Sequence, residues 1–290
     1  MVLKLKNIET TSETLKEARV NVKKMSLAKD ILIFLALYLI IIFSPLIPQL
    51  ILGDIIESES PISQIIGLLT LIPQILVIIL IVLKLEKRSL RSIGISKDNV
   101  IPSLLKGLSI GFLMFLAIVI IGFVLGQFRY NGFELSSAIY VIPFLFAFGI
   151  QSFAEEFHLR GWAMTYLSKR HGILFALIVT SIIFSANHLL NPGIDVLSLI
   201  NIFLVGILFA LMFWKYDNIW ICGATHTAWN FSQGIIFGFS VSGTSTSSIL
   251  KCSQVGQNLI NGGKFGPESS LIATFVLIIA LILIIYLPKK

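Results

Sequence analysis

Two adjacent carboxylates and an arginine lie close together in an otherwise apolar stretch of this sequence. Glu155 and Glu156 precede Arg160, and the surrounding residues 138–167 are mostly hydrophobic. Ionisable side chains at bilayer depth are costly and mark candidate functional sites. Residues four apart share a helix face, so Glu156 and Arg160 can form an ion pair. Glu155 is rotated by about 100° from its neighbour, which leaves it available for chemistry.

Histidine and asparagine recur in two later apolar stretches, as Phe184-x-x-x-His188 and His226-x-x-x-Asn230. A carboxylate beside an imidazole can hold and deprotonate a water molecule, and burial makes the carboxylate a stronger base. A second imidazole with an amide donor can stabilise a developing oxyanion. These residues predict amide hydrolysis by an activated water. Glu155 and His188 would act on the water, and His226 and Asn230 on the oxyanion.

Two further polar residues of the apolar stretches are expected to be structural. We expect His158 to face away from Glu155 and to pack between helices or at the lipid interface. Asn187 is expected to bridge two helices by a hydrogen bond. The sequence contains no His-Glu-x-x-His motif, and no Ser or Cys nucleophile shows a paired base. The common serine and zinc protease signatures are therefore missing.

The composition indicates which elements must position these side chains. The chain has 290 residues, of which 56% are hydrophobic and 13% charged, whereas average proteins carry roughly 25% charged residues. Apolar runs of about 20 residues, long enough to cross a hydrocarbon core of roughly 30 Å, recur along it. We predict an all-α, polytopic transmembrane bundle of about eight helices in the cell membrane. The predicted spans are residues 31–52, 65–85, 105–125, 138–167, 172–190, 196–214, 219–239 and 270–287.

The basic residues indicate how this bundle is oriented. With eight spans, all but four of the 22 Lys and Arg residues fall in loops on one side. The exceptions are Arg129, Lys251 and Lys264 on the other side, and Arg160 within a span. Because cytoplasmic loops carry the excess of Lys and Arg, both termini are predicted to be cytoplasmic. This orientation explains the net charge of +7 without a nucleic-acid partner.

The chain divides into two predicted parts. Residues 1–30 are polar and basic, and we expect a solvated cytoplasmic tail, with a short helix on anionic lipid as the alternative. Residues 31–290 form the transmembrane domain, whose motif-bearing core covers about 138–239. Residues 240–269 form a loop rich in Ser, Gly and Asn. The two cysteines show no disulfide or zinc-site spacing.

Counting along the helices indicates that the motifs can meet. The fourth and fifth predicted spans form a hairpin that turns near His171. Glu155 and His188 are both roughly 24–26 Å from that turn, at about 1.5 Å of rise per residue. By the same rise, His226 and Asn230 lie roughly 13 and 20 Å along their helix. We therefore expect all three motifs to converge on one pocket in the membrane.

Together the motifs resemble those of the CPBP family, the CAAX proteases and bacteriocin-processing enzymes, which are intramembrane glutamic endopeptidases. The residues that carry the resemblance, on three helices in this order, are Glu155-Glu156-x-x-x-Arg160, Phe184-x-x-x-His188 and His226-x-x-x-Asn230. The resemblance implies that Glu155 activates the water with help from His188. It also implies an oxyanion site made by His226 and Asn230. The Glu156–Arg160 pair would support the first helix.

Three classes of function remain open at this point. The first is an endopeptidase that cuts a membrane-associated protein or peptide in CAAX-type processing, bacteriocin maturation or self-immunity. The second is a proton-coupled transporter, although the sequence shows neither repeat symmetry nor paired broken helices. The third is a non-catalytic membrane immunity or regulatory protein. We expect no cofactor, with zinc held by the two histidines and a glutamate as the alternative.

Overall fold

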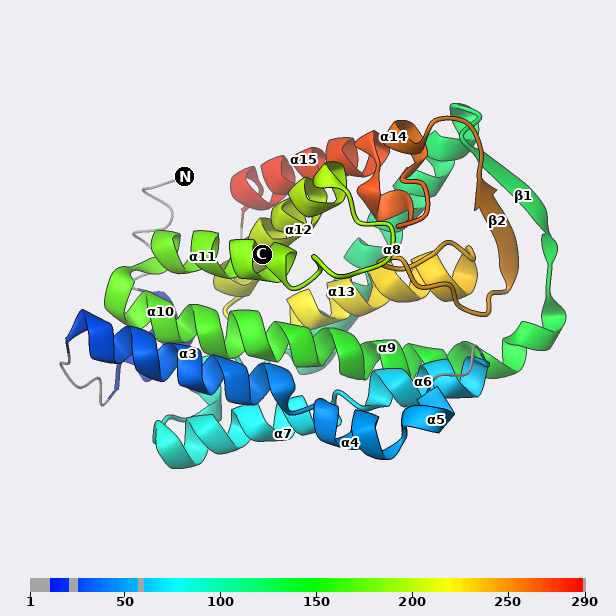
Figure 1. The fold of residues 1–290 in the computed structure, drawn as a ribbon. Helices are drawn as coiled ribbons and strands as arrows, with labels where there is room; N and C mark the ends of the chain where they lie inside the picture. The colour runs from blue at the N-terminus through cyan, green and yellow to red at the C-terminus, as the bar shows by residue number, and fades with distance from the viewer. Residues whose placement is uncertain (1–10, 21–25, 57–59, 289–290) are drawn as a thin grey trace.

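A bundle of apolar helices with a small two-stranded sheet at one end makes up the computed structural model, which describes residues 11–20, 26–56 and 60–288 (Figure 1). The α-helices are α2 (Glu13–Arg19), α3 (Leu27–Phe43), α4 (Leu46–Ile51), α5 (Gly53–Ile56), α6 (Pro61–Leu69), α7 (Ile72–Leu80), α8 (Val100–Val124), α9 (Val141–Glu156), α10 (Met164–His171), α11 (Ile173–Ala186), α12 (Val196–Tyr216), α13 (Trp220–Phe231), α14 (Asn258–Asn261) and α15 (Leu271–Tyr286). Three π-helices are η1 (Ile81–Leu85), η4 (Phe157–Ala163) and η5 (Ser232–Ile236), and three 3₁₀ turns are η2 (Leu90–Ile93), η3 (Leu135–Tyr140) and η6 (Pro267–Ser269). The strands are β1 (Phe128–Phe133) and β2 (Leu250–Gln254).

Each of the eight predicted spans contains helix. Among the described residues, five helical stretches are long and apolar enough to cross a membrane: Ala28–Ile51, Pro61–Leu85, Val100–Val124, Leu135–His171 and Val196–Tyr216. Helices α11 and α15 are shorter apolar helices, and α13 is extended by η5. The first span contains α3 and α4, and the second contains α6, α7 and η1. The breaks between α3 and α4 and between α6 and α7 lie next to Pro45 and Pro73, because a proline cannot continue the preceding hydrogen-bond ladder. The predicted all-α polytopic bundle is confirmed.

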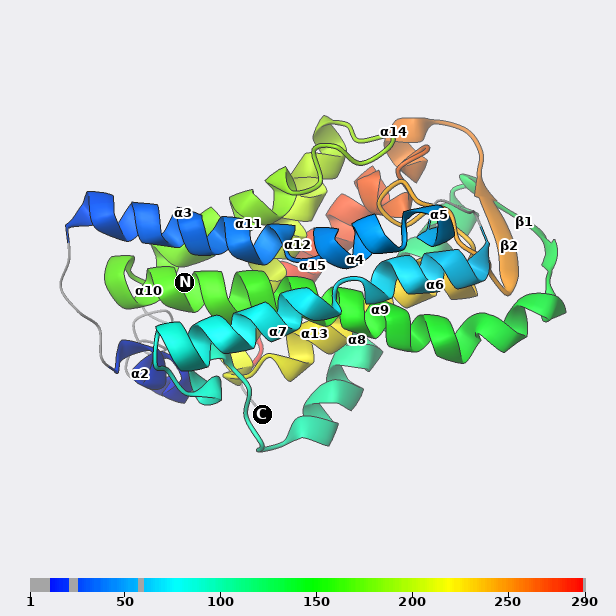
Figure 2. The same ribbon diagram turned by 60° about the horizontal axis from the view of Figure 1, so that its bottom comes forward.

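Helix α13 lies at the centre of the bundle, among α8, α9 and α12 (Figures 1 and 2). Every residue from Ile221 to Asn230 is buried. Helix α8 packs directly on it through Gly107 and Gly111. A Cβ atom on Gly107 would lie 2.5 Å from the carbonyl oxygen of Ile221, and one on Gly111 would overlap that of Thr225. Small residues four apart allow this close approach of two backbones.

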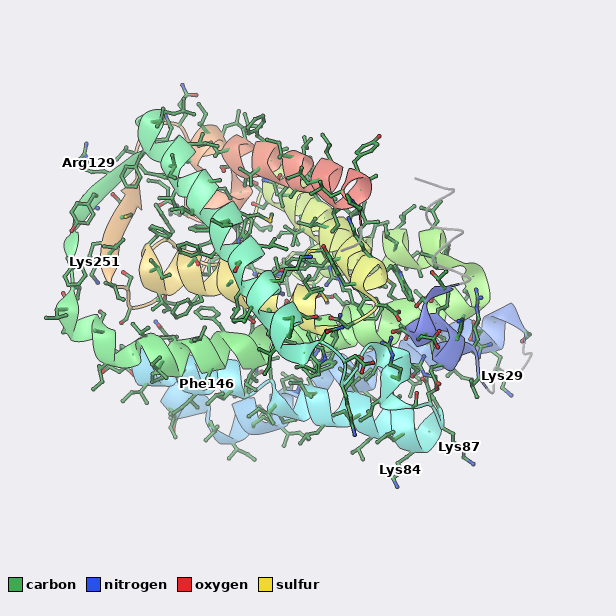
Figure 3. All side chains as sticks on the ribbon, turned by 180° about the vertical axis from the view of Figure 1, so that it is seen from behind. Lys29, Lys84, Lys87, Arg129, Phe146 and Lys251 are labelled. Atoms are coloured by element: carbon green, nitrogen blue, oxygen red, sulfur yellow. The ribbon has the colours of Figure 1, made fainter. Side chains whose placement is uncertain are left out.

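Basic side chains lie at opposite ends of the bundle. Figure 3 shows Lys29, Lys84 and Lys87 at one end and Arg129 and Lys251 at the other. This separation is the one expected when the first three face the cytoplasm. The extreme residues of the chain lie outside the described ranges, so the cytoplasmic location of both termini stays a prediction.

The N-terminal segment differs from the expected solvated tail. Helix α2 buries Leu15 completely, and its first turn is capped by Asp217, which follows α12. The carboxylate accepts hydrogen bonds from the Glu13 N–H at 3.0 Å and the Ser12 hydroxyl at 2.5 Å. Arg91 forms an ion pair with it at 2.5 Å. These partners are distant in sequence, so local polarity could not reveal the docking. Residues 1–10 and 21–25 of the predicted tail lie outside the described ranges.

The expected loop at residues 240–269 also contains structure. Strand β2 pairs antiparallel with β1, with Tyr130 opposite Cys252, and α14 and η6 follow it. Asn201 on α12 donates from its amide to the carbonyl oxygen of Glu268 at 2.8 Å. The loop therefore turns back toward the centre of the bundle and contributes to the site described next.

Candidate active site

The first motif lies where α9 passes into the π-helix η4. Such π turns are frequent at functional sites. Glu156 and Arg160 are fully buried and form the ion pair expected from their spacing, with 3.0 Å between Oε1 and Nη1. Arg160 also donates to the carbonyl oxygen of Gly206 on α12 at 3.2 Å, and its guanidinium lies 4.4 Å from the centre of the Phe184 ring. The pair therefore connects three segments.

Glu156 has a second partner, His226 on α13. Their contact joins His226 Nδ1 to Glu156 Oε1 at 3.1 Å. Because an ionised carboxylate only accepts hydrogen bonds, Nδ1 carries the proton. The other ring nitrogen, Nε2, lies 4.0 Å from Oε2 of Glu155. His226 thus lies between the two adjacent carboxylates of the first motif.

Gln151 connects Glu155 to the third motif. Its amide nitrogen donates to Glu155 Oε1, and its amide oxygen accepts from Asn230 Nδ2 at 3.0 Å. The other oxygen of Glu155, Oε2, is buried and has no hydrogen-bond partner in the described part of the chain. Our reading of the sequence missed Gln151, although its position four residues before Glu155 on the same helix could have indicated it.

His188 lies just beyond the C-terminal end of α11. Its Nδ1–H donates to the carbonyl oxygen of Phe184 at 2.8 Å, one of the carbonyls that the end of a helix leaves unpaired. This bond leaves the lone pair on Nε2. The Phe184 ring lies edge-on to both His188 and His226, with ring centres 5.1 and 6.0 Å apart. Phe184 therefore positions both imidazoles.

Two cavities meet at Glu155 and His188. The first, here called the amide cavity, has a volume of about 280 Å³ and lies between α3–α4, α7, α9–η4 and α11. The second, here called the motif cavity, has a volume of about 390 Å³ and is also lined by His226 and Asn230. The structure therefore brings all four side chains predicted for catalysis onto one cavity, as the depth count predicts.

Two sequence expectations about neighbouring residues have different outcomes. The hydroxyl of Tyr38 on α3 donates to Asn187 Oδ1 at 2.7 Å, so the predicted helix bridge is confirmed. The expectation that His158 faces away from Glu155 is wrong, because both line the amide cavity. Residues three apart on a helix lie on the same side, which the prediction failed to apply.

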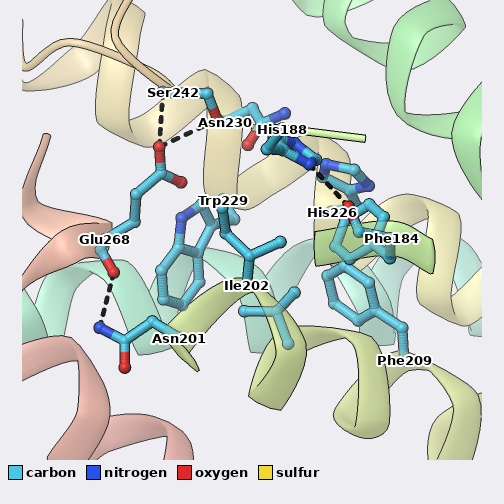
Figure 4. A pocket seen from close by; sticks show the side chains of 11 residues that line it. Phe184, His188, Asn201, Ile202, Phe209, His226, Trp229, Asn230, Ser242 and Glu268 are labelled. Carbon is cyan, nitrogen blue, oxygen red and sulfur yellow. Dashed lines mark hydrogen bonds between the residues drawn. The ribbon is translucent and has the colours of Figure 1, made fainter. Parts of the chain in front are cut away.

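Glu268 is a further acidic residue at the site, and it comes from the loop before α15. It lines a small cavity of about 30 Å³ together with His188, His226 and Asn230 (Figure 4). Its carboxylate accepts hydrogen bonds from the backbone N–H of Ser242 at 2.5 Å and from the Ser242 hydroxyl at 3.1 Å. Burial raises the pKa of the Glu268 carboxyl, and these hydrogen bonds oppose the shift. No spacing in the sequence connects this loop residue to the motifs.

Comparison with known proteins gives one result for the segment that carries the motifs. Residues 137–232 match a family model described as Type II CAAX prenyl endopeptidase Rce1-like. The matched segment is about a third of the chain and contains α9 to α13, with all three motifs. This motif-bearing third of the chain is similar to the Rce1-like CAAX proteases. Comparison with curated proteins and with solved structures finds no match.

The similarity to CAAX proteases indicates a peptidase, and the apolar helices are those of a multi-pass membrane protein. The matched segment includes the two carboxylates, the three motif histidine and asparagine residues and the central helix α13. Helices α3, α4 and α7, which form one wall of the amide cavity, lie outside it. The chain therefore combines the matched segment with a cavity wall contributed by the helices that precede it.

Proposed function

We propose that this chain is a CAAX-type glutamic endopeptidase, which cuts a peptide bond of a membrane-associated protein or peptide with a water molecule bound between Glu155 and His188. The observation that carries the proposal is that two residues with an acceptor atom not used within the protein line the same cavities. Glu155 Oε2 has no hydrogen-bond partner among the described residues, and His188 presents the lone pair of Nε2. Both residues line the same two cavities.

The first step is attack by this water. One of its protons passes to Glu155 Oε2 while its oxygen bonds to the carbonyl carbon of the scissile peptide. His188 Nε2 accepts the other O–H and orients the oxygen. General-base catalysis by a positioned side chain contributes typically about 10²–10⁴-fold to the rate.

The second step is stabilisation and collapse of the tetrahedral intermediate. Asn230 uses one amide hydrogen on Gln151 and has a second for the oxyanion. The Nδ1–H of His226 already donates a hydrogen bond to Glu156. The other ring nitrogen, Nε2, can therefore donate only after it receives a proton. The proton held by Glu155 passes to Nε2 when the two atoms, 4.0 Å apart in the structure, approach to hydrogen-bond distance. His226 then donates to the oxyanion, and its proton leaves with the amine when the C–N bond breaks.

Within this proposal Glu156 does more than support its helix. It orients the imidazole of His226 and keeps its proton on Nδ1, as carboxylates do for many ligating or catalytic histidines. Arg160 in turn compensates the buried charge of Glu156. The two supporting residues therefore act through His226.

The proposed reaction needs no metal. Among the described residues, no group of three or more His, Cys, Asp and Glu side chains has a metal-binding arrangement. Zinc held by Glu155 and the two motif histidines is the alternative, and such a site would use three protein ligands and an open position. Activity that survives exhaustive chelation, in protein without metal by elemental analysis, supports the metal-free reaction. Loss of activity on chelation and its recovery with zinc would overturn it.

The substrate class is the remaining choice: a prenylated CAAX-type peptide, or a bacteriocin-type peptide in maturation or self-immunity. The test compares the peptides of membranes from cells that carry the wild-type protein and Glu155→Gln, at equal abundance. Cleavage products present only with the wild type identify substrates and support the proposal. Identical peptides in the two membranes would contradict it and would favour a non-catalytic or transport role.

A further inference from the structure

His158 lines the amide cavity, and one of its ring nitrogens is buried without a hydrogen-bond partner in the described ranges. The side chain is 2% exposed. Its ring packs between Tyr38 and Trp162, with ring centres 4.9 and 6.1 Å away. Gln74 on α7 contacts Nδ1 through its amide nitrogen at 3.2 Å, whereas Nε2 is buried without a hydrogen-bond partner.

These contacts determine which nitrogen carries the proton. The amide nitrogen of Gln74 can only donate, so Nδ1 of His158 is the acceptor. In the neutral ring the proton is then on Nε2. A buried N–H without an acceptor is costly, and most buried polar groups in native proteins are paired. The Nε2–H therefore points to a ligand that supplies an acceptor in the cavity.

The walls of the amide cavity indicate what kind of ligand this is. Besides the catalytic pair, it is lined by four side-chain amides, Gln49, Gln74, Asn187 and Asn191, together with apolar residues. Amides offer both donors and acceptors, which match the alternating N–H and C=O groups of an extended peptide backbone. Each of these amides has one atom hydrogen-bonded within the protein, and a hydrocarbon chain would offer no partner to the other atom, so a lipid tail is a poor occupant.

The amide cavity adjoins the reaction centre. Glu155, His188 and Asn191 line both the amide cavity and the motif cavity. A peptide whose scissile bond lies at Glu155 therefore extends from one cavity into the other. His158, one helical turn beyond Glu155, is placed to meet the backbone near that bond.

We propose that the amide cavity binds an extended backbone segment on one side of the scissile bond, and that His158 Nε2–H donates to a carbonyl oxygen of this segment. The proposal rests on the proposed peptidase function and assigns a substrate-binding residue to it.

The test uses two variants of the full-length protein and a fluorogenic peptide with a prenylated CAAX-type C-terminus. His158→Phe keeps a ring between Tyr38 and Trp162 but has no N–H. We expect KM to rise about tenfold, as for one lost hydrogen bond, with little change in kcat. His158→Gln supplies an N–H of similar reach and should recover most of the lost affinity. His171→Phe, a histidine outside both cavities, is the matched control and should behave as wild type.

A second measurement identifies the bond directly. Peptides in which one backbone carbonyl at a time is replaced by a thioamide, a weaker acceptor, are bound to Glu155→Gln protein. One position should weaken binding to protein with His158 and have no effect in the His158→Phe background. Unchanged KM and unchanged binding in His158→Phe, at normal abundance, would overturn the inference and leave the peptidase function intact. No cleavage by the wild-type protein would instead contradict the peptidase function, and cleavage by Glu155→Gln would contradict the role of Glu155 as the base.

Gln74→Met keeps the proposal testable if His158→Phe does not accumulate. Without the Gln74 donor, the ring proton of His158 can move to Nδ1, so KM should rise by less than in His158→Phe. Unchanged KM in Gln74→Met would then count against the proposed hydrogen bond.

Discussion

Oε1 of Glu156 accepts from His226 Nδ1 at 3.1 Å and from Arg160 Nη1 at 3.0 Å. One buried carboxylate oxygen thus connects the first motif to the third. This contact links the stability of the bundle to the protonation of the proposed oxyanion donor, because a change at Glu156 affects both partners.

Glu156→Gln should therefore reduce both stability and activity. The substitution removes the buried charge that compensates Arg160, and breaking a buried ion pair costs about 3–5 kcal/mol. We expect a lower melting temperature in detergent and slower cleavage. Glu134→Gln changes a half-buried carboxylate just after β1 and serves as the control. Equal melting temperatures for Glu156→Gln and wild type would show that the pair contributes little.

Gln151→Met should lower kcat while the protein remains folded. Methionine is similar in size but removes both hydrogen bonds, one to Glu155 and one from Asn230. The proposed base and the proposed oxyanion donor then lose their common support, and we expect about a tenfold lower kcat, on the order of one hydrogen bond. Steady-state kinetics at equal protein abundance measure it. A higher KM with unchanged kcat would instead place Gln151 in substrate binding.

Gly111→Ala should destabilise the centre of the bundle. The new Cβ would overlap the carbonyl oxygen of Thr225 and push α8 away from α13, which carries His226. Overpacking of this kind costs about 1–3 kcal/mol. Gly149→Ala, on α9, is the matched control, because a Cβ there meets no atom within 4 Å. A thermal melt of both variants checks this. If helix packing decides, only Gly111→Ala lowers the melting temperature, whereas the general helix preference for alanine would stabilise both variants.

Asp217→Ala should release helix α2 from the bundle. It removes the cap on Glu13 and Ser12 and the ion pair with Arg91. It also places alanine at φ 55°, a conformation that Asp and Asn tolerate better. We expect faster trypsin cleavage at Lys16 and an intermediate rate in Asp217→Asn, which keeps an acceptor oxygen. Equal cleavage rates for the three proteins would mean that other contacts dock α2.

The sequence by itself determined the features that depend on local spacing. Apolar runs of bilayer length predicted the helices, and the four-residue spacing predicted the Glu156–Arg160 pair, because a helix places residues four apart on one face. The distribution of Lys and Arg predicted that Arg129 and Lys251 lie at the end opposite Lys29. The same local rule would have placed His158 beside Glu155 and identified Gln151, where our predictions did not apply it.

Only the tertiary structure decided the contacts between segments far apart in the chain. Glu268 reaches the site because its loop turns back over α13, Gln74 meets His158 across two helices, and Asp217 caps a helix about 200 residues earlier. None of these pairs leaves a periodic signal, since helical spacing acts over a few residues only. Their meeting depends on how helices pack and loops return, which is a property of the whole bundle.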